Sequence, residues 1–293
     1  MGYTIGIDIG GTKIAGVLVT EKGKIQKCTI LPTEANKGRK RIVENIIKVI
    51  NYLDNGKIQK IGIGTPGFID KKNKLVLIKN IPSLTGFDLA NTLKNKTGKK
   101  VSIHNDAKCF AVAEHRLGAG KGYKNMVGFI IGTGIGAGII INNQLYEGTS
   151  YGASEIGHTI ISDKSDKCSC GNHGDLESLC SGPNIVKRHN SIKGIKRMKS
   201  PKDIFSSRDI KTKKFVDETL DYLAKGIANI VNILDPGIIV IGGGLSHLPI
   251  FKEINKRFKK YTNANSAKSN IIEKNHLGDY SGAIGAALLS FNH

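Results

Sequence analysis

The sequence predicts an α/β protein of two related lobes, and two observations carry that prediction. An apolar strand, a Gly/Thr turn and a returning apolar strand follow one another from Tyr3 to Val19, and the same layout recurs from Met126 to Ile141. Apolar residues also recur at helical spacing, as in the run from Ile42 to Leu53. A repeated supersecondary unit indicates two similar lobes, and 293 residues are enough for two domains of ordinary size.

The individual elements follow from apolar runs and from the residues that interrupt them. Pro236 cannot continue a helix, so the helix before it ends near Leu234, and Asp106 is placed to cap the helix that follows it. Strands are expected at 3–9, 14–20, 24–30, 58–63, 101–104, 126–131, 137–141 and 238–241, and helices at 42–53, 89–94, 107–117, 215–234 and 281–291.

A Gly-rich stretch near residues 117–124 is the best domain boundary. It divides the chain into a small N-terminal lobe of residues 1–117 and a large lobe of residues 118–280. The last helix, 281–293, is expected to join the small lobe.

Charge and cysteine usage limit the classes of function. The net charge of +20 is compatible with an acidic partner, but the lysines are scattered over nearly every segment, which favours an ordinary surface without a specific nucleic-acid partner. The dense stretch 193–214 is expected to be a solvated, helical insert.

No signal peptide precedes the first strand and no apolar run reaches the roughly 20 residues of a bilayer span, so we expect a cytoplasmic protein with no membrane partner. The five cysteines lack a disulfide spacing, and Cys28, Cys109 and Cys180 look like small apolar fillers.

One short run, from Tyr151 to Glu177, gathers residues that bind metals and polyols. His158, Cys168 and Cys170 fall within it, and zinc takes imidazole and thiolate ligands in tetrahedral geometry. Glu155 stands three residues before the histidine, so a structural metal and a polar ligand pocket can share one residue. The alternative is a surface loop with two unrelated cysteines, which the clustering of these residues with glycines disfavours.

Three glycine clusters follow apolar strands, at 10–11, 132–138 and 242–244. Glycine lets backbone N–H groups approach phosphate oxygens closely. None of the clusters matches the P-loop pattern or the dinucleotide-binding GxGxxG pattern. Two Gly/Thr hairpins and a third Gly-rich turn, facing each other across a cleft, would hold a nucleotide.

These segments resemble those of a known superfamily. Asp8-Ile9-Gly10-Gly11-Thr12-Lys13, Gly132-Thr133-Gly134-Ile135-Gly136-Ala137-Gly138 and Ile241-Gly242-Gly243-Gly244 look like the two phosphate segments and the adenosine segment of the sugar kinase, actin and heat-shock ATPase superfamily. Glu155-Ile156-Gly157-His158, followed by Cys168-Ser169-Cys170-Gly171, resembles the ROK family of sugar kinases and repressors. The resemblance implies two actin-like (ribonuclease H-like) lobes with an interlobe cleft, and ATP with Mg²⁺ as cofactors.

The resemblance also implies roles for individual residues. Asp106, in the sequence Asn105-Asp106-Ala107, would be the general base that takes the proton of a sugar hydroxyl; the alternative is that it only caps its helix. Asp8 would hold Mg²⁺ through water. The nucleotide-binding set is Asp8, Gly10, Gly11, Thr12, Lys13, Gly132, Thr133, Gly134, Gly136, Gly242, Gly243 and Gly244, and the sugar-binding set is Gly67, Asn80, Asn105, Asp106, Glu155, His158 and Glu177.

One position departs from the family pattern CxCGxxGCxE. Here the chain reads CSCGNHGDLE, with Asp175 where the last cysteine belongs. Zinc accepts carboxylate oxygen, so the expected metal ligands are His158, Cys168, Cys170 and Asp175. His173 and Cys180 are nearby substitutes for the fourth ligand, and a weak or absent zinc site is the remaining alternative.

The leading hypothesis is an ATP-dependent hexose kinase with glucose as its substrate, which forms glucose 6-phosphate. Within this class, N-acetylmannosamine, N-acetylglucosamine and fructose kinases are the rivals. A sugar-responsive regulator belongs to a different class; because the chain starts at the first strand, we expect no helix-turn-helix domain ahead of it. A non-catalytic sugar sensor is disfavoured by the presence of both Asp8 and Asp106. The expected partners are a hexose, ATP and a second copy of the chain.

Overall fold

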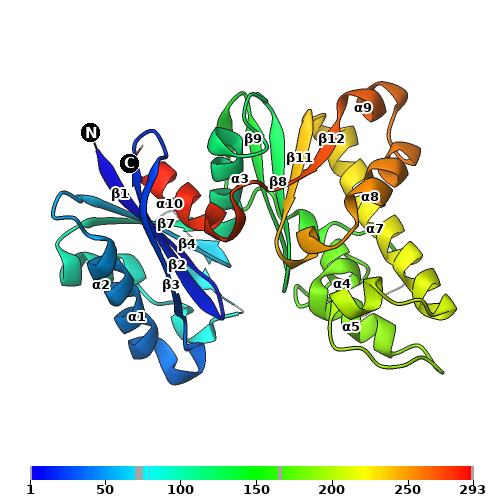
Figure 1. Cartoon of the computed structure of the whole chain (residues 1–293), viewed down its shortest axis with the longest axis horizontal. Coiled ribbons are helices and arrows are strands. Elements are labelled where there is room, and N and C mark those ends of the chain that lie inside the picture. Colours follow the sequence, from blue (N-terminus) through cyan, green and yellow to red (C-terminus); the bar gives the residue numbers. More distant parts are fainter. Residues whose placement is uncertain (1, 70–74, 79, 164–166, 292–293) are drawn as a thin grey trace.

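The computed structural model describes residues 2–69, 75–78, 80–163 and 167–291. It contains two five-stranded sheets, each with helices packed against it (Figure 1). The first sheet has the order β3-β2-β1-β4-β7 and the second the order β10-β9-β8-β11-β12. In both sheets three consecutive antiparallel strands are followed by two parallel ones, so the expected repeat of one unit is confirmed.

The strands agree closely with the expected ranges. The first sheet contains β1 (Tyr3–Ile9), β2 (Lys13–Thr20), β3 (Ile25–Pro32), β4 (Lys60–Thr65) and β7 (Lys100–Asn105), and a separate hairpin contains β5 (Phe68–Ile69) and β6 (Leu75–Leu77). The second contains β8 (Met126–Ile131), β9 (Ile135–Ile141), β10 (Gln144–Tyr146), β11 (Ile238–Gly242) and β12 (Ile271–Lys274). The two short edge strands β10 and β12 were not expected.

The helices surround the sheets. They are α1 (Gly38–Leu53), α2 (Leu89–Thr97), α3 (Asp106–Leu117), α4 (Leu176–Cys180), α5 (Gly182–Asn190), α6 (Pro201–Phe205), α7 (Ile210–Leu234), α8 (Phe251–Arg257), α9 (Ala264–Ser269) and α10 (Ser281–Phe291). Short 3₁₀ turns lie at Ala35–Lys37, Pro82–Leu84, Ile156–His158, Gly244–His247, Phe258–Lys260 and Gly278–Tyr280. No helix in these described ranges is both long and apolar enough to cross a membrane.

Helices α3 and α10 lie between the two sheets (Figure 1). Helix α10 packs on β1, β2 and β4, while α3 packs on β8 and β9 and against α10. The two helices approach so closely that a Cβ at Gly285 would lie 1.7 Å from the Cys109 carbonyl oxygen. Helix α3 contacts strands of both sheets, so its contacts do not assign it to one lobe. The domain boundary between residues 117 and 118 therefore stays a prediction.

Two smaller expectations from the sequence are wrong in part. Cys109 and Cys180 are buried as expected, but Cys28 is exposed on β3, an edge strand. The basic stretch 193–214 is helical only over α6 and the first residues of α7, and Ile204 and Thr212 anchor it because both side chains are fully buried.

Candidate active site

Strand register brings the predicted site residues of the first sheet together. Parallel strands β1, β4 and β7 pair side by side, with Asp8 opposite Gly64 and Thr65 opposite Asn105. The carboxyl ends of parallel strands meet at one edge of a sheet, and this is where open α/β sheets bind ligands. Asp106 follows directly as the first residue of α3.

The carboxyl groups of Asp8 and Asp106 have raised pKa values. Burial and, after it, the negative charge of Asp106 raise the pKa of Asp8 to about 7, although the positive charge of Lys13 acts in the opposite direction. Burial is also the main reason that the pKa of Asp106 is raised to about 6. A hydrogen bond that its Oδ1 accepts from the Ala107 N–H at 2.8 Å lowers the pKa and so limits this rise. Glu155 adds to this rise through its charge, so the three acids share one electrostatic environment. Groups perturbed in this way are typical of catalytic sites.

Asn105, and not Asp106, caps helix α3. The Asn105 side-chain oxygen accepts from the Lys108 N–H at 3.1 Å, and its amide donates to the Gly67 carbonyl at 3.3 Å. The expectation that Asp106 is the N-cap is therefore wrong, because the extended residue before it fills that role. The Asp106 carboxylate therefore does not cap α3, although its Oδ1 accepts from the Ala107 N–H.

The two Gly/Thr turns are held by backbone hydrogen bonds. Gly10 donates to the Lys13 carbonyl at 2.9 Å, and Gly132 donates to the Gly134 carbonyl at 2.9 Å. Thr12 and Thr133 are both exposed. A Cβ at Gly136 would lie 3.0 Å from the Ala107 side chain, which places the second turn against the start of α3.

The remaining expected ligands lie around these turns with different local roles. The Asn80 carbonyl oxygen lies 3.4 Å from a Cβ built at Gly11, so Asn80 neighbours the first Gly/Thr turn. Gly243 and Gly244 are exposed, but Gly242 is buried and a Cβ there would lie 2.5 Å from the Phe110 ring. Close packing against Phe110 of α3 is therefore enough to explain why residue 242 is a glycine.

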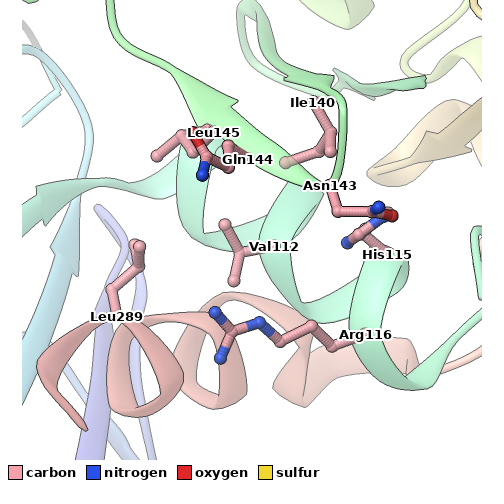
Figure 2. Close-up of a pocket in the computed structure, with 8 residues that line it drawn as sticks. All are labelled: Val112, His115, Arg116, Ile140, Asn143, Gln144, Leu145 and Leu289. Atoms are coloured by element: carbon pink, nitrogen blue, oxygen red, sulfur yellow. The ribbon is translucent and has the colours of Figure 1, made fainter. Parts of the chain in front are cut away.

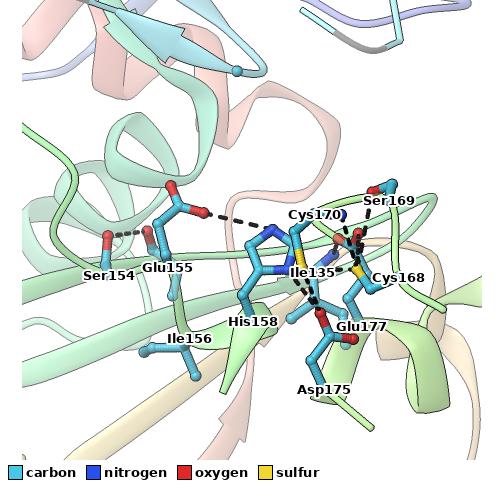
Figure 3. A network of polar contacts seen from close by, with 12 residues as sticks. Ile135, Ser154, Glu155, Ile156, His158, Cys168, Ser169, Cys170, Asp175 and Glu177 are labelled. Atoms are coloured by element: carbon cyan, nitrogen blue, oxygen red, sulfur yellow. Dashed lines mark hydrogen bonds and ion pairs between the residues drawn. The ribbon is translucent and has the colours of Figure 1, made fainter. Parts of the chain in front are cut away.

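Four side chains of the Tyr151–Glu177 run converge as a metal site requires (Figure 3). His158 Nδ1 lies 3.0 Å from Asp175 Oδ2 and 3.7 Å from Cys168 Sγ, and Cys170 Sγ lies 3.3 Å from Asp175 Oδ2. All four ligand atoms lie within 4.8 Å of one another. Tetrahedral zinc with bonds of about 2.0–2.3 Å separates its ligand atoms by about 3.3–3.8 Å. The residues present therefore fit zinc.

Asp175 is the fully buried member of this cluster. Its Oδ1 accepts from the Ser178 N–H at 2.8 Å and so caps α4, while its Oδ2 faces the other ligand atoms. Burial raises its pKa, but hydrogen bonds from Cys168, His158 and Ser178 outweigh that effect and lower the pKa to about 2. Cys180, the substitute ligand considered from the sequence, instead donates to the Thr219 carbonyl in the core.

His158 and Glu177 connect this cluster to the rest of the site. The other ring nitrogen of His158, Nε2, faces Glu155 Oε2 at 3.9 Å, on the side away from the cysteines (Figure 3). Glu177 Oε2 accepts from the Ile135 N–H at 2.8 Å, and Glu177 Oε1 lies 3.9 Å from Cys168 Sγ. Glu177 thus links the loop with the candidate metal ligands to the Gly132–Gly136 turn.

Lys108, a buried lysine on α3, was not predicted from the sequence. Its ammonium donates to the Tyr151 carbonyl at 2.8 Å, at a residue with a left-handed backbone (φ 62°). Burial lowers the pKa of Lys108, while the charges of Glu147 and Glu155 act in the opposite direction. The sequence does hold a clue to this residue. Lys108 stands two residues after Asp106 and is the one charged residue in the apolar part of the helix, from Ala107 to Ala113.

A separate pocket of about 250 Å³ lies at the far end of α3 (Figure 2). Its lining comes from α3, the β9–β10 hairpin and α10, and includes His115, Arg116 and Leu289. Ten helical residues, or roughly 15 Å, separate Arg116 from Asp106. The pocket therefore does not coincide with the predicted active site.

Comparison with known proteins gives matches over nearly the whole chain. The profile described as the ROK family matches residues 4–292. The chain is 31% identical to the glucokinase of Thermotoga maritima over 302 residues, which is 97% of this chain and 95% of that protein. It is 32% identical to the N-acetyl-D-glucosamine kinase of Photobacterium profundum over 303 residues, which is 97% of this chain and 98% of that protein.

Two solved structures share the fold. The ROK hexokinase from Thermus thermophilus superposes with a TM-score of 0.88 at 28% identity, covering 99% of this chain and 98% of that one. A ROK family glucokinase from Streptomyces griseus, solved with glucose and AMPPNP, superposes with a TM-score of 0.82 at 29% identity over the full length of both chains. These matches confirm the predicted two-lobed, actin-like fold class.

Proposed function

The chain belongs to the ROK family, and from this premise we propose that it is an ATP-dependent sugar kinase that phosphorylates a hexose hydroxyl. The observation that carries the proposal is the position of Asp106. This aspartate begins α3 next to Asp8 and Glu155, and its pKa of about 6 suits a base that works near neutral pH.

Asp106 acts as the general base in this proposal. Its carboxylate takes the proton of the attacking sugar hydroxyl as the oxygen bonds to the γ-phosphorus and the bond to the β-phosphate oxygen breaks. General-base help of this kind contributes about 10²–10⁴-fold. Positioning and charge neutralisation supply the rest of the rate in phosphoryl transfer.

The two Gly/Thr turns bind the phosphates. The hydroxyls of Thr12 and Thr133 and the N–H groups of Gly11 and Gly134 are the donors, and Gly243 and Gly244 lie at the end of β11, toward the adenosine. Asp8 would hold Mg²⁺, which neutralises phosphate charge when bound. Burial and the neighbouring Asp106 raise the pKa of Asp8, and a bound cation would offset both effects.

The sugar hydroxyls bind to Asn105, Asp106, Glu155, His158 and Glu177, with Gly67 and Asn80 nearby. Carboxylates and amides suit a polyol because they fix several hydroxyls and reject analogues that lack them. The two ring nitrogens of His158 face different groups, so Nδ1 can bind zinc while Nε2 binds a hydroxyl.

Zinc is a structural cofactor in this proposal. His158, Cys168, Cys170 and Asp175 would hold it, and the ion would order the loop that carries Glu155, His158 and Glu177. The ligand separations described above support this assignment.

Glucose is the proposed substrate, to give glucose 6-phosphate, and N-acetylglucosamine is the second candidate. The latter is favoured by relatives of that name, which match this chain as well as the glucokinases do. A matching ROK transcriptional regulator, at 20% identity, shares only the fold.

An ADP-release assay over a panel of hexoses and N-acetylhexosamines tests the proposal. We expect turnover with glucose to exceed turnover with N-acetylglucosamine. The reverse order would transfer the assignment to the second candidate, and the absence of ADP release with every sugar would refute the kinase.

A further inference from the structure

Glu114 is a fully buried carboxylate on α3 with four neutral hydrogen-bond donors. Its Oε2 accepts from the backbone N–H groups of Ala119 and His276, each at 3.0 Å. Its Oε1 accepts from the Leu277 N–H and the Ser281 hydroxyl, also at 3.0 Å. A buried ionised carboxylate is costly unless it is fully hydrogen-bonded, and this one is.

Three of these donors belong to a single connection. The chain leaves the second sheet at the end of β12, passes through His276 and Leu277, and enters α10 at Ser281. Glu114 therefore ties α3 to the segment that returns from the second sheet to the first. Gly118 makes room for this contact, because a Cβ there would lie 2.0 Å from Glu114 Oε2.

Of the two helices that Glu114 connects, α3 carries one central acid of the site and α10 contacts the other, which lies on β1. Asp106 is the first residue of α3, and Asp8 Oδ2 lies 2.5 Å from a Cβ built at Gly282, the second residue of α10. The same connection contacts the first Gly/Thr turn through an ion pair between Asp279 and Lys13 at 3.0 Å. Strand register sets the backbone of Asp8 relative to Asp106, and α10, packed against α3, confines the Asp8 side chain and the first Gly/Thr turn from the other side.

We infer that Glu114 is a positioning residue for phosphoryl transfer. Its carboxylate fixes α10 against α3 and so fixes the nucleotide-side groups Asp8 and Lys13 relative to the base Asp106. This inference rests on the proposed kinase function. The sugar-binding residues Glu155, His158 and Glu177 lie outside the connection that Glu114 holds, so sugar affinity does not depend on it.

Glu114→Gln tests the inference, because the amide presents an N–H donor where the carboxylate accepts. We expect turnover to fall about 10–100-fold and the dissociation constant of Mg²⁺–AMPPNP to rise at least fivefold, while the dissociation constant of the hexose changes less than twofold; both constants are measured by titration calorimetry. Glu44→Gln on α1, an exposed glutamate, is the matched control and should leave all three quantities unchanged.

The outcomes separate the possible failures. A purely structural role would lower the melting temperature of Glu114→Gln with turnover and nucleotide affinity unchanged at 20 °C, and this result overturns the inference. If Glu114→Gln does not fold, Ser281→Ala, which removes one donor of the four, should change turnover and nucleotide affinity in the same direction by a smaller factor. A folded Ser281→Ala with wild-type values overturns the inference too. A wild-type protein without turnover on any sugar would instead refute the proposed function.

Discussion

Turnover should depend on the ionisation of Asp106, and the size of this effect can be worked out. A base acts only when it is ionised. With a pKa of about 6 instead of the ordinary 3.8, about nine-tenths of Asp106 is ionised at pH 7 and about one-tenth at pH 5. The ratio kcat/KM for the sugar, which reports the ionisation of the free enzyme, should therefore fall about tenfold between these pH values. Asp8, with a pKa of about 7, can only steepen the loss.

Asp106→Asn should separate this chemical role from a structural one. We expect turnover to drop about 10²–10⁴-fold, since the amide cannot accept the proton. The folded-state pKa lies above the unfolded one, so the wild-type carboxylate destabilises the folded protein above pH 6, and this cost disappears as the pH falls through about 6 to 3.8. Removing the buried charge should therefore raise the stability at pH 7.5, by about 3 kcal/mol at most.

The assays are ADP release between pH 5 and 8, and thermal unfolding at pH 7.5. Asp217→Asn, on an exposed aspartate of α7, is the matched control and should keep the wild-type pH profile. A flat profile from pH 7 to pH 5, with the protein folded throughout, would refute the reasoning about the base. Near-normal turnover of Asp106→Asn would do the same.

Three further predictions follow from the site and from the surface charge. Elemental analysis of the wild-type protein should find one zinc per chain. Asp175→Asn should lower zinc retention at least tenfold, whereas Asp175→Cys should retain zinc as the wild type does. If the wild-type protein contains no zinc, the proposed zinc site is refuted. Lys108→Met should raise the KM for the hexose several-fold, because it removes the hydrogen bond to the Tyr151 carbonyl. Lys48→Met, on the α1 surface, is the control and should leave this KM unchanged. Equal KM values in the two variants would count against a role of Lys108 in holding the loop at Tyr151. DNA binding should be weak, independent of sequence and lost steeply between 50 and 200 mM salt, and sequence-specific binding in a gel-shift assay would contradict this expectation.

Sequence patterns identified the sheets and the first half of the site for a physical reason. Long apolar strands and Gly/Thr turns leave a strong local signal, and Asp8, Asn105 and Asp106 stand at strand ends, where register brings them together. The short edge strands β10 and β12 bury few residues and leave little signal, so they were not predicted.

The buried ionisable groups of α3 were harder to find. Helix α3 lies between two sheets and a second helix, so it buries residues on nearly all sides, and the rule that charged positions mark the solvent face fails for Lys108 and Glu114. Glu114 does follow Phe110 and Ala111 at helical spacing, which places an acid within an apolar stripe. Such an acid in a sequence predicts a buried hydrogen-bond network, but three of its four partners lie more than 160 residues away and come only from the tertiary structure.

Asp175 shows how a departure from a family pattern can still leave four candidate ligand groups together. A cysteine has one ligand atom and cannot both bind a metal and accept strongly from a helix N-terminus. The aspartate has two oxygens, and here Oδ1 caps α4 while Oδ2 joins His158, Cys168 and Cys170. The cap orients the carboxylate before any metal binds, and the next residue but one, Glu177, is then held where it reaches the Ile135 N–H. The substitution thus replaces a thiol with a carboxylate that caps α4 and still faces the other three candidate ligands.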